Sequence, residues 1–410
     1  MIDDTYERLL DSLPDINEKS LDDRLLATYR AAVDGHFLLA DDADELLDYS
    51  IKRNVQKYSS DALGLTIAPT LMCNFRCVYC YETSKPGIIS QETQDNVVKF
   101  VSSRIENLKD FDVTWYGGEP LLAVDAIASL SERFQKICSD HNVRYSAFMI
   151  SNGSLIDQNI VALMKKHSIQ GIQITIDGPP EVHDSRRISK NGKSSFLSII
   201  DHINLLLSNG IEVFIRINVD KTNEETLDRL IAYLASHLLN QSVKISFGQV
   251  TAYTEACRSI ESSCFHNEEF AGRLAKYYEI LQNHGFQKAN PFPYPSARLN
   301  YCCAELMNSF VLDHEGYLYK CWNLVGDVSR AIGNINDSSF DTASDKNAFW
   351  VVRDPLLNPQ CKECSILPLC VGGCPYNRLL QPSSSNCDLI RYNIEDVMLT
   401  YYRYAKEGLL

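Results

Sequence analysis

The sequence of 410 residues lacks long apolar segments and a basic N-terminus. No apolar run approaches the ~18 residues that cross a bilayer, which excludes a membrane span. The chain begins Met-Ile-Asp-Asp, which is acidic where a signal peptide would be basic. Internal repeats and low-complexity tracts are also missing. We therefore expect a cytoplasmic protein without a membrane partner.

Basic residues are scarce: 39 Lys and Arg stand against 53 Asp and Glu, which gives a formal net charge of −14. Non-specific nucleic-acid binding depends on neutralising phosphates, so we expect no nucleic-acid partner. The hydrophobic fraction of 45% and the charged fraction of 22% are typical of soluble globular proteins. At ~100–200 residues per domain, the length predicts two or three domains.

The 14 cysteines are too few for a disulfide scaffold, in which cysteine exceeds ~8–10% of the chain. Because we expect a cytoplasmic location, metal or redox chemistry is the better interpretation. Three cysteines lie within residues 73–80, and seven form a second group that begins at Cys303 and ends at Cys387. The other four are Cys138, Cys257, Cys264 and Cys302.

Strand and helix patterns alternate through residues 63–286. Short, mostly apolar strands are each followed by a helix pattern. Six such units predict a parallel sheet with right-handed crossovers, and a closed barrel needs eight. We expect an α/β fold, a partial (β/α)6 TIM-like barrel with its catalytic groups at the carboxyl ends of the strands. The predicted strands cover residues 65–68, 112–116, 145–150, 172–176, 213–219 and 243–250, and the helices residues 91–104, 124–138, 157–167, 196–208, 224–236 and 268–284.

The segments that flank the barrel have weaker patterns. The N-terminal segment is mostly helical, with a helix over residues 21–32 and one short strand over residues 36–39. After the barrel come a hairpin over residues 309–320 and a final helix over residues 388–404. The predicted division is an N-terminal extension (1–62), the barrel (63–286), a cysteine-rich domain (287–390) and a C-terminal helix (391–410).

The first cysteine group, Cys73-Asn-Phe-Arg-Cys77-Val-Tyr-Cys80, closely follows the first predicted strand. Loops of three and then two residues let the three thiolates converge on one centre. A [4Fe–4S] cluster held by three cysteines keeps one iron open for another ligand. The alternatives are a zinc site that lacks one ligand and a set of reduced structural thiols.

This cysteine spacing, with an aromatic residue (Tyr79) just before the third cysteine, resembles the signature of the radical S-adenosylmethionine (SAM) enzymes. The resemblance implies that the amino and carboxylate groups of SAM chelate the open iron. It also implies that an electron from the cluster cleaves SAM to a 5′-deoxyadenosyl radical, which abstracts hydrogen from substrate. The task of the protein is then to position SAM and to exclude side reactions.

Further residues resemble the SAM contacts of that family, and each lies in or after a predicted strand. The backbone of a Gly-Gly-Glu-Pro turn, with Glu119, is implied to hold the SAM amino group, and glycines allow close backbone approach. The Ser-Asn-Gly segment at Ser151 resembles a contact to the ribose and carboxylate. The implied cofactor-binding residues are Tyr79, Gly117, Gly118, Glu119, Pro120, Ser151, Asn152, Asp177 and Arg216.

Two basic features each leave alternatives open. A charge within a strand is costly unless it is paired, so Arg216 meets either the SAM carboxylate or a protein carboxylate in a structural ion pair. The basic strip over residues 186–193 is either a solvated loop or a contact for an acidic peptide. No catalytic acid or base stands out in the sequence.

The second cysteine group consists of Cys303, Cys321, Cys361, Cys364, Cys370, Cys374 and Cys387. This seven-cysteine spacing resembles the SPASM domain, an iron–sulfur extension of radical SAM enzymes that modify peptides and proteins. The resemblance implies two auxiliary [4Fe–4S] clusters, and thus three clusters in all. A zinc ribbon is the alternative, because cysteine pairs two residues apart also bind zinc. The implied ligands are Cys303, Cys321 and Cys374 for the first auxiliary cluster and Cys361, Cys364, Cys370 and Cys387 for the second.

Seven cysteines leave eight coordination positions one short. Cys257 and Cys264 together rank slightly above an open site as the fourth ligand of the first auxiliary cluster. We rank Cys302 last, because neighbouring side chains in an extended chain point to opposite faces. Cys138 lies within a predicted helix and is expected to be a small buried side chain.

The resemblance implies a radical SAM peptide maturase that installs a thioether or carbon–carbon cross-link in a ribosomally made precursor peptide. The Cys80-Tyr81-Glu82 continuation and the N-terminal extension favour this subclass. An anaerobic sulfatase-maturating, formylglycine-forming enzyme is the first alternative, and a non-catalytic SAM-binding redox sensor or scaffold is the second. The implied partners are the precursor peptide and an electron donor such as flavodoxin or ferredoxin. Residues 1–60 lack the strands of a complete leader-binding module, so we expect that leader recognition is weak, uses another surface or needs a separate leader-binding protein.

Overall fold

The computed structural model describes residues 8–9, 19, 21–35, 37–238, 243–286, 290, 294–380 and 387–408. These residues form two units, Met1–Lys52 and Arg53–Leu410, and each is described by itself. The division into four domains that the sequence suggests stays a prediction. None of the described helices combines the length and apolar character that crossing a bilayer requires.

The N-terminal unit contains helix α2 (Asp23–Asp34) and the first part of α3 (Glu45–Tyr58). The Asp22 carboxylate caps α2 by accepting a hydrogen bond from the Leu25 backbone at 2.9 Å, which confirms the predicted helix. The predicted strand over residues 36–39 is wrong where the structure describes it, at residues 37–39, because no neighbouring strand pairs with that segment. His36 lies outside the described residues.

The second unit is built on one large sheet, with the strand order β11-β10-β9-β1-β3-β4-β5-β7-β8 among the described residues. All pairings between β1 and β8 are parallel, which confirms the predicted partial barrel. The six barrel strands are β1 (Ala62–Ile67), β3 (Asp110–Trp115), β4 (Arg144–Ser151), β5 (Ile169–Thr175), β7 (Glu212–Val219) and β8 (Lys244–Gln249).

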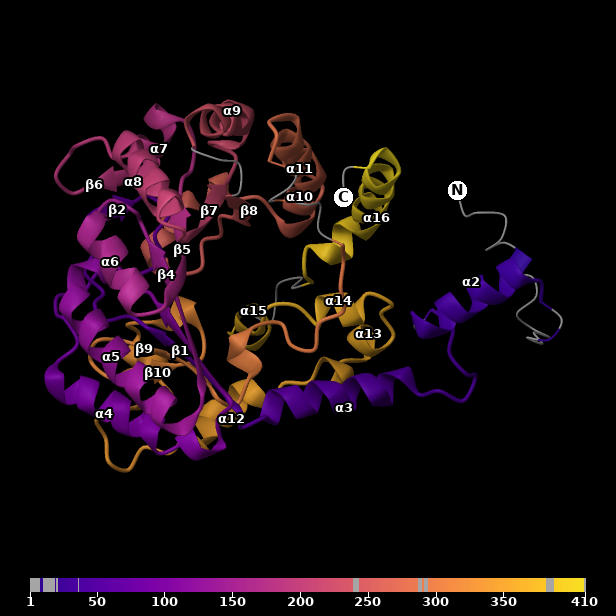
Figure 1. The fold of residues 1–410 in the computed structure, drawn as a ribbon, viewed down its shortest axis with the longest axis horizontal. Coiled ribbons are helices and arrows are strands. Elements are labelled where there is room, and N and C mark those ends of the chain that lie inside the picture. Colours follow the sequence, from indigo (N-terminus) through magenta and orange to yellow (C-terminus); the bar gives the residue numbers. More distant parts are fainter. Residues whose placement is uncertain are drawn as a thin grey trace. The chain divides into compact units, whose positions relative to one another are not determined.

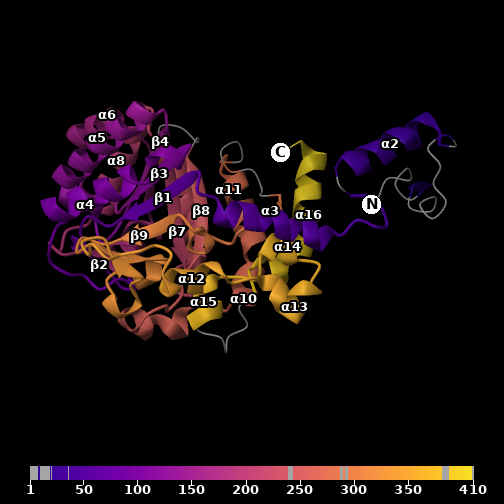
Figure 2. The same cartoon turned by 90° about the horizontal axis from the view of Figure 1, so that it is seen from below.

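Helices cover one face of this sheet, and Figures 1 and 2 both place α4, α5, α6 and α8 together there. The predicted helix over residues 268–284 is two helices, because Gly272 and Arg273 interrupt it. The short pair β2–β6 joins the loop after β1 to the chain after α7. The bounds are α4 (Gln91–Ser102), α5 (Val124–His141), α6 (Gln158–Lys166), α7 (Pro180–Arg186), α8 (Phe196–Ser208), α9 (Leu227–His237), α10 (Asn267–Ala271), α11 (Leu274–Asn283), β2 (Phe75–Cys77) and β6 (Arg187–Ser189).

Residues of β7 alternate between two environments. Val213, Ile215 and Ile217 are buried in the core, whereas Arg216 and Asn218 are only partly buried. In a strand, successive side chains point to opposite faces of the sheet. The polar residues of β7 therefore point away from the apolar core and into the barrel interior.

The C-terminal segment extends the barrel sheet. The predicted hairpin over residues 309–320 is confirmed as β9 (Ser309–Leu312) and β10 (Tyr317–Tyr319), and β9 pairs in parallel with β1. Figure 2 shows α12 and α15 across the sheet from α5 and α6. The remaining elements are β11 (Gly333–Asn334), α12 (Asp345–Val351), α13 (Pro359–Lys362), α14 (Leu367–Cys370), α15 (Pro375–Leu380) and α16 (Ile390–Glu407), the last of which confirms the predicted final helix.

Candidate functional site

A cavity of about 880 Å³ opens at the carboxyl ends of the barrel strands, where the fold predicts catalytic groups. This volume lies within the ~300–1,000 Å³ typical of ligand sites. Both cysteine groups contribute to its wall. Of the sequence-predicted site residues, those that line it are Cys73, Cys77, Tyr79, Cys80, Gly117, Gly118, Ser151, Asn152, Arg216, Cys303 and Cys321.

The first cysteine loop forms one side of the cavity. The pairing of β2 with β6 and a backbone hydrogen bond of 3.0 Å from Val78 to Arg186 fix the loop. Partial burial raises the pKa of the Cys73 thiol to about 11, whereas Cys80 is exposed. The Cys73 thiol therefore favours its proton unless a positive centre stabilises the thiolate, as coordinated metal does.

The Gly-Gly-Glu-Pro turn packs against the segment that leads into the cysteine loop. A Cβ atom at Gly117, whose φ is 113°, would lie 2.4 Å from the backbone oxygen of Thr70. A Cβ atom at Gly118 would lie 2.4 Å from that of Met72. Glycine is required here because two stretches of backbone meet, and the same backbone lines the cavity.

Glu119 is fully buried and does not line the cavity among the described residues. Its carboxylate accepts hydrogen bonds from the Leu121 backbone (3.0 Å), the Asn152 backbone (2.8 Å) and the Ser151 hydroxyl (2.9 Å). Burial raises its pKa, and these hydrogen bonds oppose that shift. Glu119 thus joins the ends of β3 and β4, and its contact with a SAM amino group stays a prediction. Pro120 is buried beside it and starts the helical turn that follows.

Asn152 links the end of β4 to the first cysteine loop. Its side-chain amide donates to the Asn74 Oδ1 atom at 2.7 Å and lies 3.9 Å from the Cys73 sulfur. The Asn74 amide in turn donates to the Ser154 hydroxyl at 2.9 Å. The cysteine loop is therefore held in place by the strand end that the sequence predicts to contact SAM.

Tyr79 belongs to a network of polar side chains, and the sequence identifies only some of its members as site residues. Its hydroxyl donates to the Asp177 carboxylate and accepts from the Arg187 guanidinium at 2.7 Å. The Asn218 backbone donates to Asp177 at 3.1 Å. Asp177 therefore orients Tyr79 beside the cysteines and does not itself line the cavity among the described residues.

The basic strip over residues 186–193 is not a solvated loop at its start. Arg186 and Arg187 are buried, and Arg186 forms an ion pair with Asp220 at 2.9 Å. Arg187 and Lys190 line the cavity. The sequence did not reveal this, because the carboxylate partner of Arg186 lies 34 residues away along the chain.

Arg216 points into the cavity and has no carboxylate partner within the part of the chain that the structure describes. Its Nε atom donates to the Asn218 side chain at 2.8 Å. Its guanidinium packs on Gly248, where a Cβ atom would approach within 2.2 Å. The structural ion pair that the sequence left open is thus not found among the described residues, and the guanidinium is available to an anionic ligand.

Aromatic residues and one carboxyl group line the cavity between the two cysteine groups. Tyr81 and Tyr116 join hydroxyl to hydroxyl, and the Tyr116 and Trp322 rings lie 4.8 Å apart. Burial raises the pKa of the Glu82 carboxyl group to about 7, and a hydrogen bond with Tyr116 opposes this shift. In the sequence, Tyr81 and Glu82 indicate only a subclass, and no motif marks Tyr116 or Trp322 as site residues.

The second cysteine group falls into two places. Cys302, Cys303 and Cys321 line the cavity, and burial, with a smaller contribution from the neighbouring Cys374, raises the pKa of Cys321 to about 12. Four others lie away from the cavity: the Cys370 sulfur accepts from the Asp388 backbone at 3.5 Å beside Cys387, and the Cys364 sulfur is 3.4 Å from the Arg391 guanidinium. Cys361 precedes Cys364 by one helical turn at the end of α13. The two ligand sets stay predictions.

Within the described ranges, no three His, Cys, Asp or Glu side chains are placed to hold a single metal ion. A [4Fe–4S] cluster is larger than one ion and binds each cysteine through a different iron. The three thiols that line this roomy cavity suit such a cluster, and Arg216 and Asn152 in the same wall would meet a further ligand.

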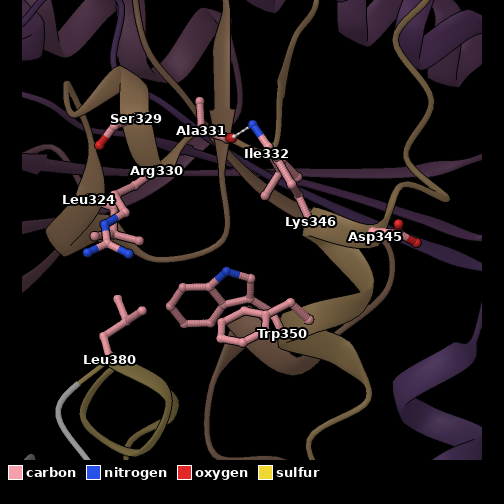
Figure 3. Close-up of a pocket in the computed structure, with 10 residues that line it drawn as sticks. Leu324, Ser329, Arg330, Ala331, Ile332, Asp345, Lys346, Trp350 and Leu380 are labelled. Carbon is pink, nitrogen blue, oxygen red and sulfur yellow. Dashed lines mark hydrogen bonds between the residues drawn. The ribbon is translucent and has the colours of Figure 1, made fainter.

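A second pocket, of about 300 Å³, lies in the C-terminal segment and contains none of the predicted site residues. Figure 3 shows Trp350 and Leu380 facing its interior, while the Lys346 ammonium donates to the Ala331 carbonyl at 3.2 Å. Its wall is mostly apolar and carries no cluster of chemically reactive side chains. The chemistry therefore belongs to the larger cavity.

Comparison with known proteins matches residues 67–234 to the radical SAM superfamily. Among curated proteins, the chain is similar to a cysteine-type anaerobic sulfatase-maturating enzyme of Clostridium novyi, at 23% identity over 77% of this chain and 89% of the relative. It is also similar to a serine-type anaerobic sulfatase-maturating enzyme of Klebsiella aerogenes, at 21% identity over 74% and 77% of the two chains.

Two solved structures share the fold. Native anSMEcpe with bound AdoMet superposes with a TM-score of 0.64 at 20% identity, covering 85% of this chain and 98% of that chain. Streptococcus suis SuiB bound to its precursor peptide SuiA superposes with a TM-score of 0.51 at 16% identity, covering 90% and 81%. At these identities the likeness establishes the fold.

Proposed function

We propose that the chain, whose residues 67–234 match the radical SAM superfamily, is a radical SAM enzyme that modifies a side chain of a peptide or protein. The observation that carries the proposal is the single cavity whose wall contains both the three-cysteine loop and Cys303 and Cys321. A substrate side chain held there lies between the site of radical formation and a second redox centre.

When bound together, a [4Fe–4S] cluster and SAM supply the reductive cleavage that gives a 5′-deoxyadenosyl radical. The residues that would hold the cluster are Cys73, Cys77 and Cys80. The Arg216 guanidinium is positioned to bind a carboxylate, which SAM carries, and Gly118 gives its backbone to the same cavity. Tyr81 and Trp322 form apolar walls that exclude water from a reactive intermediate.

We further propose that the modification is a thioether or carbon–carbon cross-link in a ribosomally made precursor peptide. The Tyr81-Glu82 continuation supports it, because both residues line the cavity beside the third cysteine. The fold shared with SuiB, a protein solved with a precursor peptide, supports it as well. The proposed partners are that peptide, an electron donor such as flavodoxin or ferredoxin, and a leader-binding protein.

Formylglycine formation is the second candidate. The observation in its favour is that relatives which match about three quarters of this chain are named as anaerobic sulfatase-maturating enzymes, one of the cysteine type and one of the serine type. The two candidates differ in product, because formylglycine is an aldehyde and a cross-link is not.

Anaerobic assays separate these candidates and the non-catalytic alternative. The reconstituted protein is reduced with dithionite, given SAM, and tested with peptides from neighbouring short reading frames and with sulfatase-derived peptides. Formation of 5′-deoxyadenosine together with a peptide that has lost two hydrogens and resists hydrazide labelling supports the cross-link. A hydrazide-reactive peptide establishes formylglycine instead. Absence of 5′-deoxyadenosine with every peptide and without peptide would leave only a scaffold.

A further inference from the structure

The first auxiliary cluster, whose existence rests on the proposed function, has three predicted thiolates: Cys303, Cys321 and Cys374. A [4Fe–4S] cluster has four irons, so one is left without a protein ligand in this set. An open iron binds a substrate thiolate, whereas a closed cluster is restricted to electron transfer. The identity of a fourth ligand therefore decides what this cluster does.

The backbone turns sharply between Cys302 and Cys303. Cys302 is fully extended, with φ −159° and ψ 178°, and a 3-10 turn (Cys303–Glu305) begins at the next residue. Both residues line the same cavity. The turn thus brings both side chains to one side of the chain, in contrast to the opposite faces expected for an extended segment.

Glu305 holds this turn in place. Its Oε2 atom accepts from the Tyr301 backbone at 2.8 Å, and its carboxylate is fully buried against Arg353. Arg353 also donates to the Gly372 carbonyl at 2.8 Å and the Gly373 carbonyl at 3.2 Å. One guanidinium therefore ties the Cys302–Cys303 turn to the loop that ends at Cys374.

Cys257 and Cys264, the other candidates for the fourth ligand, form hydrogen bonds to backbone carbonyl groups. The Cys257 thiol is fully buried and donates to the Thr254 carbonyl at 3.4 Å. The Cys264 thiol donates to the Ile260 carbonyl at 3.4 Å. Neither residue belongs to the cavity wall among the described residues. The ranking that the sequence suggested, with Cys302 last, is thus not the one that the geometry favours.

We propose that Cys302 supplies the fourth thiolate of the first auxiliary cluster, beside Cys303, Cys321 and Cys374. The cluster is then closed by four cysteines and offers no iron to a substrate thiolate. A target side chain in the cavity lies against the cluster without binding it, so this cluster exchanges electrons only.

The test uses the full-length chain in which Cys73, Cys77 and Cys80 are all alanine, so that only auxiliary clusters assemble. This parent protein needs neither SAM turnover nor a peptide, so the result is independent of whether the proposed reaction occurs. Cys302→Ala is introduced into it, with Cys257→Ala and Cys264→Ala as matched controls. The readouts are iron content, the electron paramagnetic resonance spectrum of the reduced clusters, and the response of that spectrum to added 2-mercaptoethanol.

In the parent and both controls we expect about eight irons, two [4Fe–4S] clusters, and no spectral change with 2-mercaptoethanol. Cys302→Ala is expected to give a shifted spectrum, to change again when 2-mercaptoethanol fills the vacated position, and to lose one iron on mild oxidation. If Cys302→Ala loses the whole first cluster, Cys302→Ser decides: a cluster with shifted g-values supports ligation.

Three results overturn the proposal. The first is a Cys302→Ala spectrum identical to that of the parent. The second is a spectral change in Cys257→Ala or Cys264→Ala with Cys302→Ala unaffected. The third is a response of the parent itself to 2-mercaptoethanol, which reports an open iron and depends on no variant that must fold.

Discussion

In the first cysteine loop, loss of hydration raises the pKa of the partly buried Cys73 thiol to about 11. Such thiols become thiolates only by binding a positive centre. Changing Cys73, Cys77 or Cys80 singly to Ala is therefore expected to abolish 5′-deoxyadenosine formation, measured by chromatography after dithionite reduction. Two thiolates cannot hold a cluster with one defined open iron.

Cys138 provides the matched control for these variants. It is 1% exposed within α5 and lies outside the cavity wall. Cys138→Ala is expected to lower thermal stability slightly and to keep SAM cleavage, and the auxiliary clusters are expected to remain in all four variants. Full SAM cleavage by a protein with all three loop cysteines replaced would refute the assignment of the loop.

Arg216 is a cation in the cavity wall with an amide partner, Asn218. A charge-assisted hydrogen bond contributes about 1.5–3 kcal/mol, so Arg216→Met is expected to weaken SAM binding by roughly 10–100-fold. Isothermal titration of the cluster-loaded, unreduced protein with SAM measures this. Unchanged affinity in Arg216→Met would show that the guanidinium meets another ligand.

Arg229→Gln is the control for Arg216. Its side chain is 62% exposed and pairs with Glu181 at the surface, where ion pairs contribute little. We expect SAM affinity to stay within the error of the titration. A loss of equal size in both variants would point to a general effect of charge rather than to a contact in the cavity.

Among individual residues, the sequence best predicted the positions at which the chemistry allows only one type of amino acid. The three cysteines of the first loop and the Gly-Gly turn line the cavity because thiolate convergence and close backbone approach tolerate no substitutes. Arg187 was not foreseen, because its partner Tyr79 lies 108 residues away along the chain. Spatial pairing of distant polar residues leaves no periodic signal.

The turn after β3 has no room for a side chain at Gly117. Gly117 has φ 113°, and a Cβ atom there would lie 2.4 Å from the Thr70 backbone oxygen. Gly117→Ala is expected to lower the free energy of unfolding by about 1–3 kcal/mol through backbone strain, with a further loss from the clash. Because Thr70 precedes the cysteine loop, iron incorporation should fall as well.

Gly210→Ala is the control that separates backbone strain from displacement of the segment before the cysteine loop. Gly210 also has positive φ, 75°, but nothing lies within 4 Å of the position of its Cβ atom. A cost of about 1–2 kcal/mol in thermal or denaturant unfolding, with full iron content, is the expected outcome. Equal iron loss in both variants would contradict the idea that the turn positions the cysteine loop.

The barrel elements were predictable because the spacing of apolar residues within each segment indicates a strand or a helix. The connection of β9 to β1 was not, since Gly64 and Ser309 pair across 245 positions of sequence. The helix over residues 268–284 was predicted as continuous because Gly272 is the single glycine in its pattern, although both Gly272 and Arg273 lie outside the two helices. The turn at Cys302 depends on Glu305 and Arg353, whose meeting only the tertiary fold reveals.

Across the whole second unit, Glu305 forms the centre of a buried charge group. It is fully buried, pairs with Arg53 at 3.0 Å and with Arg353, and Lys57 donates to the Arg353 carbonyl at 2.6 Å. Removing one partner leaves a buried charge incompletely compensated. Arg53→Met is expected to lower the free energy of unfolding by about 3–5 kcal/mol, measured by denaturant unfolding of the anaerobic protein.

Lys52→Met, at the neighbouring position, is the control for the loss of stability expected in Arg53→Met. The Lys52 side chain is 60% exposed and pairs with Asp48 one helical turn away. A change of less than about 1 kcal/mol is expected, because exposed pairs are solvated and screened. Similar losses in Lys52→Met and Arg53→Met would locate the effect in α3 itself rather than in the buried charge.

Peptide recognition concerns the whole chain, because the N-terminal unit offers helices and, over residues 37–39, no strand to which a leader peptide adds. Leader binding by strand addition requires an exposed strand edge. We therefore expect that removal of residues 1–44, which keeps α3 intact, changes the affinity for the precursor peptide by less than about threefold, or ~0.7 kcal/mol. Isothermal titration of both proteins with the same peptide measures this, and equal iron content verifies that the shortened chain is folded. A large loss of affinity with iron content unchanged would assign leader recognition to the N-terminal unit and remove the reason to expect a separate leader-binding protein.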